Sequence, residues 1–168
     1  MSAVRIPLEL NSLYISTVPL LGDTFHWAFI HVDSLGVHTR HHWAAATLDV
    51  TGPETYIENE LPSGALSKTR NNKVLGYFKI VGYKPVEIST LRHLCQQVFP
   101  TSYMTVAENR HHAITCRTWV LHIIGRLISE ERALEVERQV KARSTAQSNE
   151  YANSFLWQRP FMCIAEDV

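Results

Sequence analysis

The sequence has no excess of either charge and no closely spaced pair of cysteines. Lys+Arg and Asp+Glu both number 16, so no overall field would draw the chain to nucleic acid or to anionic lipid. The three cysteines, Cys95, Cys116 and Cys163, form no CxxC motif. This spacing argues against a zinc ribbon and against a disulfide framework. Free thiols of this kind are typical of a cytoplasmic protein.

Long hydrophobic runs are missing as well. The longest apolar stretch, residues 119–124, is interrupted by His122 and is far too short to cross a bilayer, so we expect no stable membrane insertion. Residues 1–7 lack the apolar run of a secretory signal. No repeat and no flexible linker divides the chain, and a hydrophobic content of 45% is typical of a globular protein. We therefore predict a single domain over residues 1–168.

Motifs for common cofactors are also absent. The seven glycines form no phosphate-binding loop, and the nine histidines form neither an HExxH motif nor a zinc-finger spacing with cysteine. We therefore expect neither a cofactor nor a metal ion.

Apolar periodicity predicts strands in the first half of the chain and helices in the second. Four strands are predicted, at residues 10–18, 24–32, 37–50 and 73–83. Three helices are predicted, at residues 85–98, 114–128 and 129–148. The polar residues 54–72 are predicted to form a surface excursion. This order predicts an α+β fold, with an antiparallel sheet packed against helices.

Cys116 lies where a polar loop is predicted to enter a helix, in the segment Thr115-Cys116-Arg117-Thr118-Trp119-Val120. The positive end of a helix lowers the pKa of a thiol and favours the nucleophilic thiolate. Free backbone N–H groups at that end could also hold an oxyanion. The alternative is a small core side chain, because Cys116 shares a helical face with Val120, Ile123 and Leu127.

His26 lies in an otherwise apolar strand, Phe25-His26-Trp27-Ala28-Phe29-Ile30. A single histidine in such surroundings is commonly a hydrogen-bonded core residue, but it is also a candidate general base. A thiolate–imidazolium pair between Cys116 and His26 would make the thiol reactive near pH 6.

The two segments together resemble a family of thiol enzymes. A strand with His-Trp-Ala-Phe, followed much later by Cys-Arg-Thr-Trp-Val at a helix start, resembles the circularly permuted papain-like enzymes related to NlpC-type peptidases. That group includes the relatives of lecithin:retinol acyltransferase and the PPPDE peptidases. The resemblance implies a permuted papain-like fold with Cys116 as nucleophile and His26 as general base. It also implies hydrolysis or acyl transfer at an ester, thioester or amide of a small molecule or peptide, through a covalent acyl-enzyme.

The resemblance further implies a third polar residue that orients His26 from the next strand. His38, twelve residues after His26, has the spacing of the family. Two hairpin registers remain open. In the hairpin of residues 24–32 and 37–50, the residue numbers of each pair add up to either 69 or 70, depending on the length of the turn. With a sum of 69, His41 shares the sheet face of His26; with a sum of 70, His38 and His42 share it. We take His38 as the orienting residue and His41 as the alternate.

Two other functions remain open. The chain could be a catalytically silent binding protein in which His26 and Cys116 serve packing. It could also be a cyclase or isomerase that uses histidine acid–base chemistry without a covalent intermediate. The aromatic C-terminal segment, residues 155–162, has three open roles: packing, a lid, or the surface of a homodimer.

Overall fold

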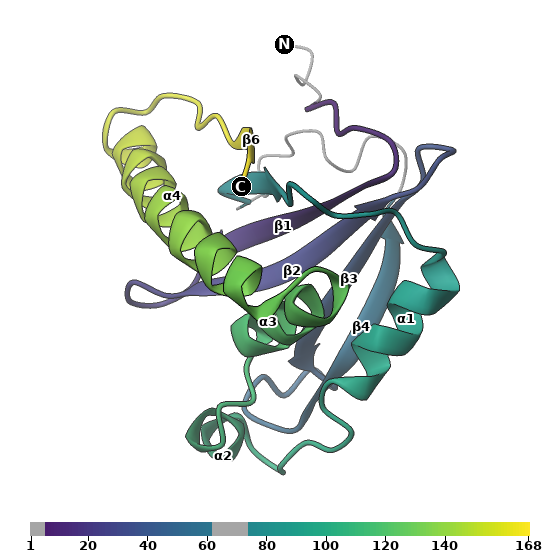
Figure 1. The fold of residues 1–168 in the computed structure, drawn as a ribbon. Helices are drawn as coiled ribbons and strands as arrows, with labels where there is room; N and C mark the ends of the chain where they lie inside the picture. The colour runs from purple at the N-terminus through teal and green to yellow at the C-terminus, as the bar shows by residue number, and fades with distance from the viewer. Residues whose placement is uncertain (1–5, 62–73) are drawn as a thin grey trace.

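The computed structural model describes residues 6–61 and 74–168, which form one sheet and four helices (Figure 1). The strands are β1 (Ser12–Pro19), β2 (Phe25–Val32), β3 (His38–Ala45), β4 (Glu54–Leu61), β5 (Gly76–Lys79) and β6 (Ile164–Asp167). The helices are α1 (Ile88–Gln97), α2 (Val106–His111), α3 (Cys116–Leu127) and α4 (Glu130–Leu156). The predicted α+β class is confirmed.

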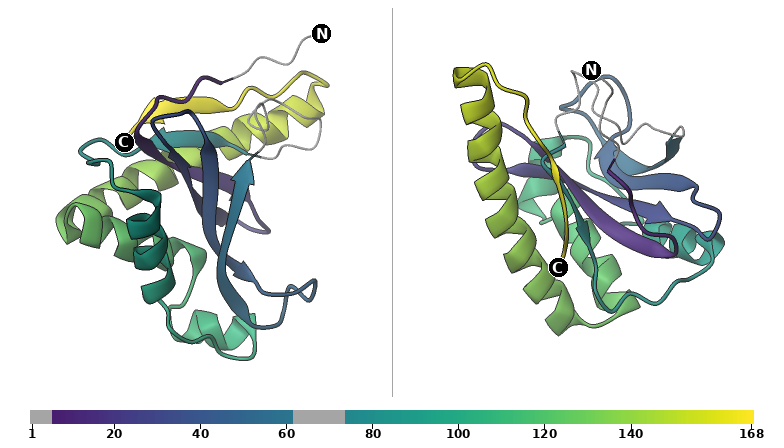
Figure 2. Two further views of the ribbon diagram at one scale, coloured as in Figure 1. Left: turned by 90° about the vertical axis from the view of Figure 1, so that its right-hand side faces the viewer. Right: turned by 90° about the horizontal axis from the view of Figure 1, so that it is seen from above.

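The strand order in the sheet is β4-β3-β2-β1-β5-β6. Strands β1 to β4 form an antiparallel meander, β5 is antiparallel to β1, and β6 is parallel to β5. Helices α1, α3 and α4 lie on one face of this sheet (Figure 2). None of the helices in the described part of the chain is long and apolar enough to span a membrane.

Several elements differ from the sequence prediction. Residues 54–61 were predicted as a surface excursion but form the edge strand β4, because Tyr56 packs against the core and Glu54 and Glu58 pair with arginines of the helices. Residues 62–72 of that excursion lie outside the described residues. The short helix α2 and the strand β6 were missed, and α4 continues past residue 148 to Leu156.

The turn between β2 and β3 selects one of the two open registers. Asp33 N–H donates to the Val37 carbonyl (3.1 Å), and Gly36 takes a φ of 80° inside a three-residue loop. The Asp33 side chain accepts from the N–H groups of Leu35 and Val37. Paired positions therefore sum to 70, as in Ala28↔His42. This register puts His42 on the sheet face that carries His26.

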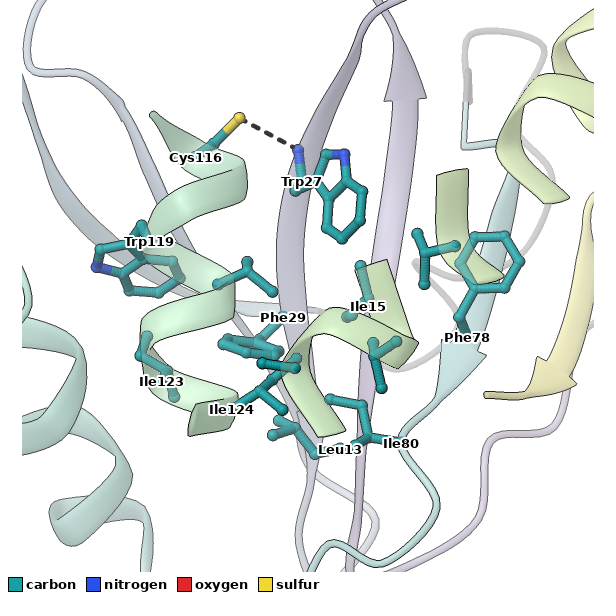
Figure 3. Packing of buried hydrophobic residues seen from close by; sticks show 14 of the residues in the cluster. Leu13, Ile15, Trp27, Phe29, Phe78, Ile80, Cys116, Trp119, Ile123 and Ile124 are labelled. Carbon is teal, nitrogen blue, oxygen red and sulfur yellow. Dashed lines mark hydrogen bonds between the residues drawn. The ribbon is translucent and has the colours of Figure 1, made fainter. Parts of the chain in front are cut away.

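The two faces of the sheet bury different clusters. Trp27 and Phe29 of β2 face the helices and pack with Trp119 and Ile123 of α3 (Figure 3). Side chains of this size stabilise the fold by about 1.5–3 kcal/mol each when fully buried. Alternate residues of β2, among them Ile30, belong to a second, smaller cluster on the opposite face.

One polar contact joins two of the helices, and another holds a helix on the sheet. The Trp119 indole N–H donates to the Cys95 carbonyl of α1 (3.0 Å), and Thr17 of β1 hydrogen bonds Ser144 of α4 (2.9 Å). The first contact fixes α3 against α1, and the second fixes α4 against β1.

The C-terminal aromatic segment is divided between packing and exposure. Phe161 contacts Tyr151, as the packing role predicts. Phe155 also contacts Tyr151, but Phe155, Leu156 and Trp157 at the end of α4 are 66–76% exposed, so most of their surface is not packed.

Candidate thiol site and its histidines

Cys116 lies in the first turn of α3, as predicted, and is the first residue of that helix because Thr115 caps it. The Thr115 hydroxyl accepts from Thr118 N–H (3.0 Å), and the Thr118 hydroxyl accepts from Thr115 N–H (3.0 Å). This reciprocal pair is a capping box, and it makes the helix begin at the cysteine. Cys116 is consequently at the positive end of the helix.

The thiol lies at the point where the sheet opens between β2 and β3. The β2–β3 pairing ends at Ala28↔His42, whereas β3 stays paired with β4 up to Ala45↔Glu54. The Trp27 N–H, beyond the last β2–β3 pair, donates to Cys116 Sγ instead (3.5 Å, Figure 3). Sγ also lies 4.0 Å from the Phe25 carbonyl oxygen. The thiol is therefore beside the backbone that carries His26.

The imidazole of His26 does not contact the thiol. Its Nε2 hydrogen bonds His42 Nδ1 (3.0 Å) on the sheet face opposite to the helices. Among the described residues no hydrogen bond joins His26 and Cys116, so the predicted pairing of the two side chains is not found in this structure. The reason is strand alternation: Trp27 and Phe25 are the neighbours whose backbone meets Sγ, and the side chain between them points away.

Burial makes both paired imidazoles neutral. Burial and the charge of Arg40 lower the pKa of His26 to about 4 and that of His42 to about 3. Neither ring is positively charged near pH 6 in this arrangement, which does not favour the predicted thiolate–imidazolium pair; that pair stays a prediction.

The predicted orienting residues lie elsewhere. His38 is paired with Val32 at the far end of the hairpin, and it does not reach His26. His42 is the ring partner of His26. It was within reach of sequence analysis, because the register that sums to 70 makes it a diagonal neighbour of His26 across the two strands.

His41 belongs to a separate buried network on the helix face. It is fully buried, and its Nδ1 hydrogen bonds the Tyr56 hydroxyl (2.7 Å). That hydroxyl donates to Glu58 Oε2 (3.0 Å), and Glu58 is paired with Arg92 of α1 (2.6 Å). Because the single Tyr56 proton goes to Glu58, His41 must donate through Nδ1–H. His41 therefore joins β3, β4 and α1 and does not orient His26.

A pocket of about 340 Å³ opens beside the thiol. It lies between the β1–β2 turn, the start of β2, the start of α3 and α4. Its lining is mixed, with apolar Leu20, Phe25 and Trp27 beside the cationic Arg110, Arg117 and Lys141. The volume is that of a small-molecule site.

The environment of the thiol contains opposing influences on its pKa. Burial raises the pKa of Cys116, whereas the Trp27 N–H and the charge of Arg110 lower it. The carboxylate of Glu54 adds a smaller increase. Burial is the larger effect, so the pKa of Cys116 lies above its ordinary value and the thiol is protonated at neutral pH.

Neither a search for metal ligands nor a comparison with known proteins assigns a function to this site. In residues 6–61 and 74–168, no three His, Cys, Asp or Glu side chains gather in a way that could hold a metal ion. Comparison of the chain with protein-family models, with curated proteins and with solved structures finds no match. The resemblance to permuted papain-like enzymes therefore stays a prediction, and the site is interpreted from its geometry.

Proposed function

We propose that the protein is a cysteine-dependent hydrolase or acyltransferase that forms an acyl-enzyme at Cys116. The observation that carries the proposal is the position of the thiol. Sγ lies on the wall of a pocket of about 340 Å³, at the first residue of a capped helix and within hydrogen-bonding distance of a backbone N–H. A helix start stabilises the negative charge that develops on the carbonyl oxygen during acyl transfer, and the Trp27 N–H that donates to Sγ stabilises the thiolate.

The proposed reaction has two steps. Sγ attacks the carbonyl carbon of an ester, thioester or amide, a carbon–sulfur bond forms, and the alcohol, thiol or amine leaves with a proton. Water, or an acceptor alcohol or amine, then attacks the thioester and releases Cys116. The substrate is a small molecule or a peptide terminus, in keeping with the size of the pocket.

The proposal needs a base for the protonated thiol, and His26 is assigned that role after a change of rotamer. Sγ already lies beside the backbone between Phe25 and Trp27. The assigned role requires the His26 side chain to leave His42 and to turn toward this edge of β2. Catalytic hydrogen bonds are often formed only when substrate is bound. In this scheme His42 holds His26 in the resting arrangement.

The first test is hydrolysis of a panel of chromogenic short-chain esters and thioesters. Cys116→Ala is expected to lower the rate by at least about 100-fold, because removal of a nucleophile eliminates the covalent step. Urea unfolding of the same variant should stay within about 2 kcal/mol of wild type, since little volume is lost. Cys163→Ser, which alters a thiol away from the pocket, is the matched control and should keep the activity. Equal rates for wild type and Cys116→Ala would contradict the proposal.

A silent binding protein is the second candidate, and a specific observation favours it. The raised pKa of Cys116 through burial, together with the His26–His42 contact, is what a packing role predicts. Acid–base catalysis by histidine alone has less support, because burial first, and then the charge of Arg40, lower the pKa of His26 and of His42 so far that both rings are neutral and poor proton donors near pH 7.

Two further parts of the proposal concern the cellular location and the oligomeric state of the protein. Cys95 and Cys116 are free thiols, which agrees with a cytoplasmic location. The exposed side chains of Phe155, Leu156 and Trp157 supply the surface through which the proposed homodimer would form. Neither part affects the chemistry at Cys116.

A further inference from the structure

Arg110, at the end of α2, is held beside the thiol pocket by a buried carboxylate. Its Nη1 and Nη2 donate to the two carboxylate oxygens of Glu54, at 2.9 Å each, and Nη1 also donates to the Ile114 carbonyl (2.7 Å). Glu54 is only 6% exposed and accepts a further bond from the fully buried Asn109 (2.9 Å). The guanidinium is therefore fixed from one side by Glu54 of β4 and by the Ile114 carbonyl between α2 and α3.

The other side of the same guanidinium is open. A guanidinium carries five N–H groups, and the bonds to Glu54 and Ile114 use both groups of Nη1 and one of Nη2. Nε–H and the second Nη2–H have no partner among residues 6–61 and 74–168. These two donors are parallel and form the fork that matches a carboxylate. Arg110 lines the pocket together with Cys116, and its side chain is 42% exposed.

We propose that Arg110 is a specificity residue that binds a carboxylate, or another planar oxyanion, of the substrate beside Cys116, and that Glu54 is its positioning residue. The inference rests on the proposed function and adds the substrate class: acyl compounds that carry an acidic group close to the reacting carbonyl.

The other two cations of the pocket fit this role less well. Arg117 and Lys141 both pair with Glu137 of α4, at 3.5 and 2.8 Å. Their side chains are 43% and 45% exposed, and no deeply buried carboxylate fixes them. Arg110 is the cation that is both held by a buried partner and left with a matched pair of donors.

Two alkylating agents that differ only in charge test the inference. Iodoacetate carries a carboxylate next to its reactive carbon, and iodoacetamide carries a neutral amide there. The ratio of their rates at Cys116, measured at pH 9 by peptide mass spectrometry, reports recognition of the carboxylate. Replacement of Arg110 by glutamine is expected to lower this ratio about tenfold, since a charge-assisted bidentate contact is worth roughly 1.5–3 kcal/mol. Arg110→Lys keeps the charge without the fork and should lose most of the preference as well.

Two further variants keep the test decisive. Arg110→Gln leaves Glu54 buried and unpaired, which can unfold a protein, so the double variant Glu54→Gln/Arg110→Gln removes both charges together. Arg126→Gln makes the same charge change on α3 outside the thiol pocket, and it should leave the ratio at the wild-type value. A purely structural role of Arg110 would slow both reagents alike and would not move their ratio.

A second arm is independent of thiol chemistry. In Cys116→Ala, butyrate is expected to shift backbone amide signals around the pocket, whereas butyramide is not. The shifts should disappear in the variant that also carries Glu54→Gln/Arg110→Gln. Carboxylate binding in Cys116→Ala without any acyl-enzyme in wild type would keep the inference and reject the proposed function. An unchanged rate ratio in both Arg110 variants, or no preference for butyrate, would overturn the inference.

Discussion

Alkylation of Cys116 by iodoacetamide at pH 7 is expected to run at a small fraction of its rate at full ionisation, because burial raises the pKa of this thiol and leaves it protonated there. Burial raises the pKa of Cys116, and the Trp27 N–H and Arg110 offset only part of that effect. The measurement is the rate of labelling at this cysteine between pH 6 and pH 10, followed by peptide mass spectrometry. Cys163, which is only partly buried, serves as the internal reference and should react first at pH 7.

The role of His26 in the resting state is tested by the same curve. His26→Ala should leave the curve of Cys116 unchanged, because the ring hydrogen bonds His42 and is neutral. A wild-type midpoint near or below pH 7 that moves to alkaline pH in His26→Ala would show an ion pair. That result would contradict the arrangement described above and would restore the pairing predicted from the sequence.

Loss of stability in mild acid is the second large effect that we expect. Burial, as the main cause, lowers the pKa of His41 to about 4, that of His26 to about 4 and that of His42 to about 3. The unfolded chain binds these protons at about pH 6.5, and the folded chain does not. The contribution of these neutral, buried rings to the free energy of unfolding is therefore complete above pH 6.5. It is lost as the pH falls from there toward 4.

The size of this loss of stability can be calculated and measured for one of these histidines. For the fully buried His41, the linkage relation gives a loss of about 2 kcal/mol between pH 7.5 and pH 5. Urea unfolding at the two pH values should show it, and His41→Asn should reduce the difference by about that amount. His93→Asn, on the exposed side of α1, is the control and should leave the difference unchanged. Parallel stability curves for wild type and His41→Asn would show that burial of this ring does not drive the acid sensitivity.

Local patterns predicted the parts of the site that depend on neighbouring residues. Apolar spacing and the polar loop before it were sufficient to place Cys116 at a helix start, and the structure adds the capping box of residues 115–118 that fixes this start. The β2–β3 hairpin was also predicted, but its register stayed open. That register depends on whether the turn has two or three residues, and one glycine with positive φ decides it.

The relation between Cys116 and His26 could not be predicted in the same way. It depends on where β2 and β3 separate, and no sequence period reports that point. The family resemblance favoured His38, whereas the observed pairing makes His42 the neighbour of His26. Arg110 and Glu54 were missed because they are 56 positions apart and meet only when α2 packs beside β4.

The most direct test of the central claim is the mass of the intact protein after brief reaction with short-chain thioesters and acid quenching. The account predicts the addition of one acyl group, mapped by peptide mass spectrometry to Cys116 and removed by neutral hydroxylamine, as expected for a thioester. Cys116→Ala should gain no acyl group, and Cys163→Ser should gain it as wild type does. An unmodified protein that turns the substrate over, or an acyl group on any other residue, would contradict the claim that Cys116 is the nucleophile.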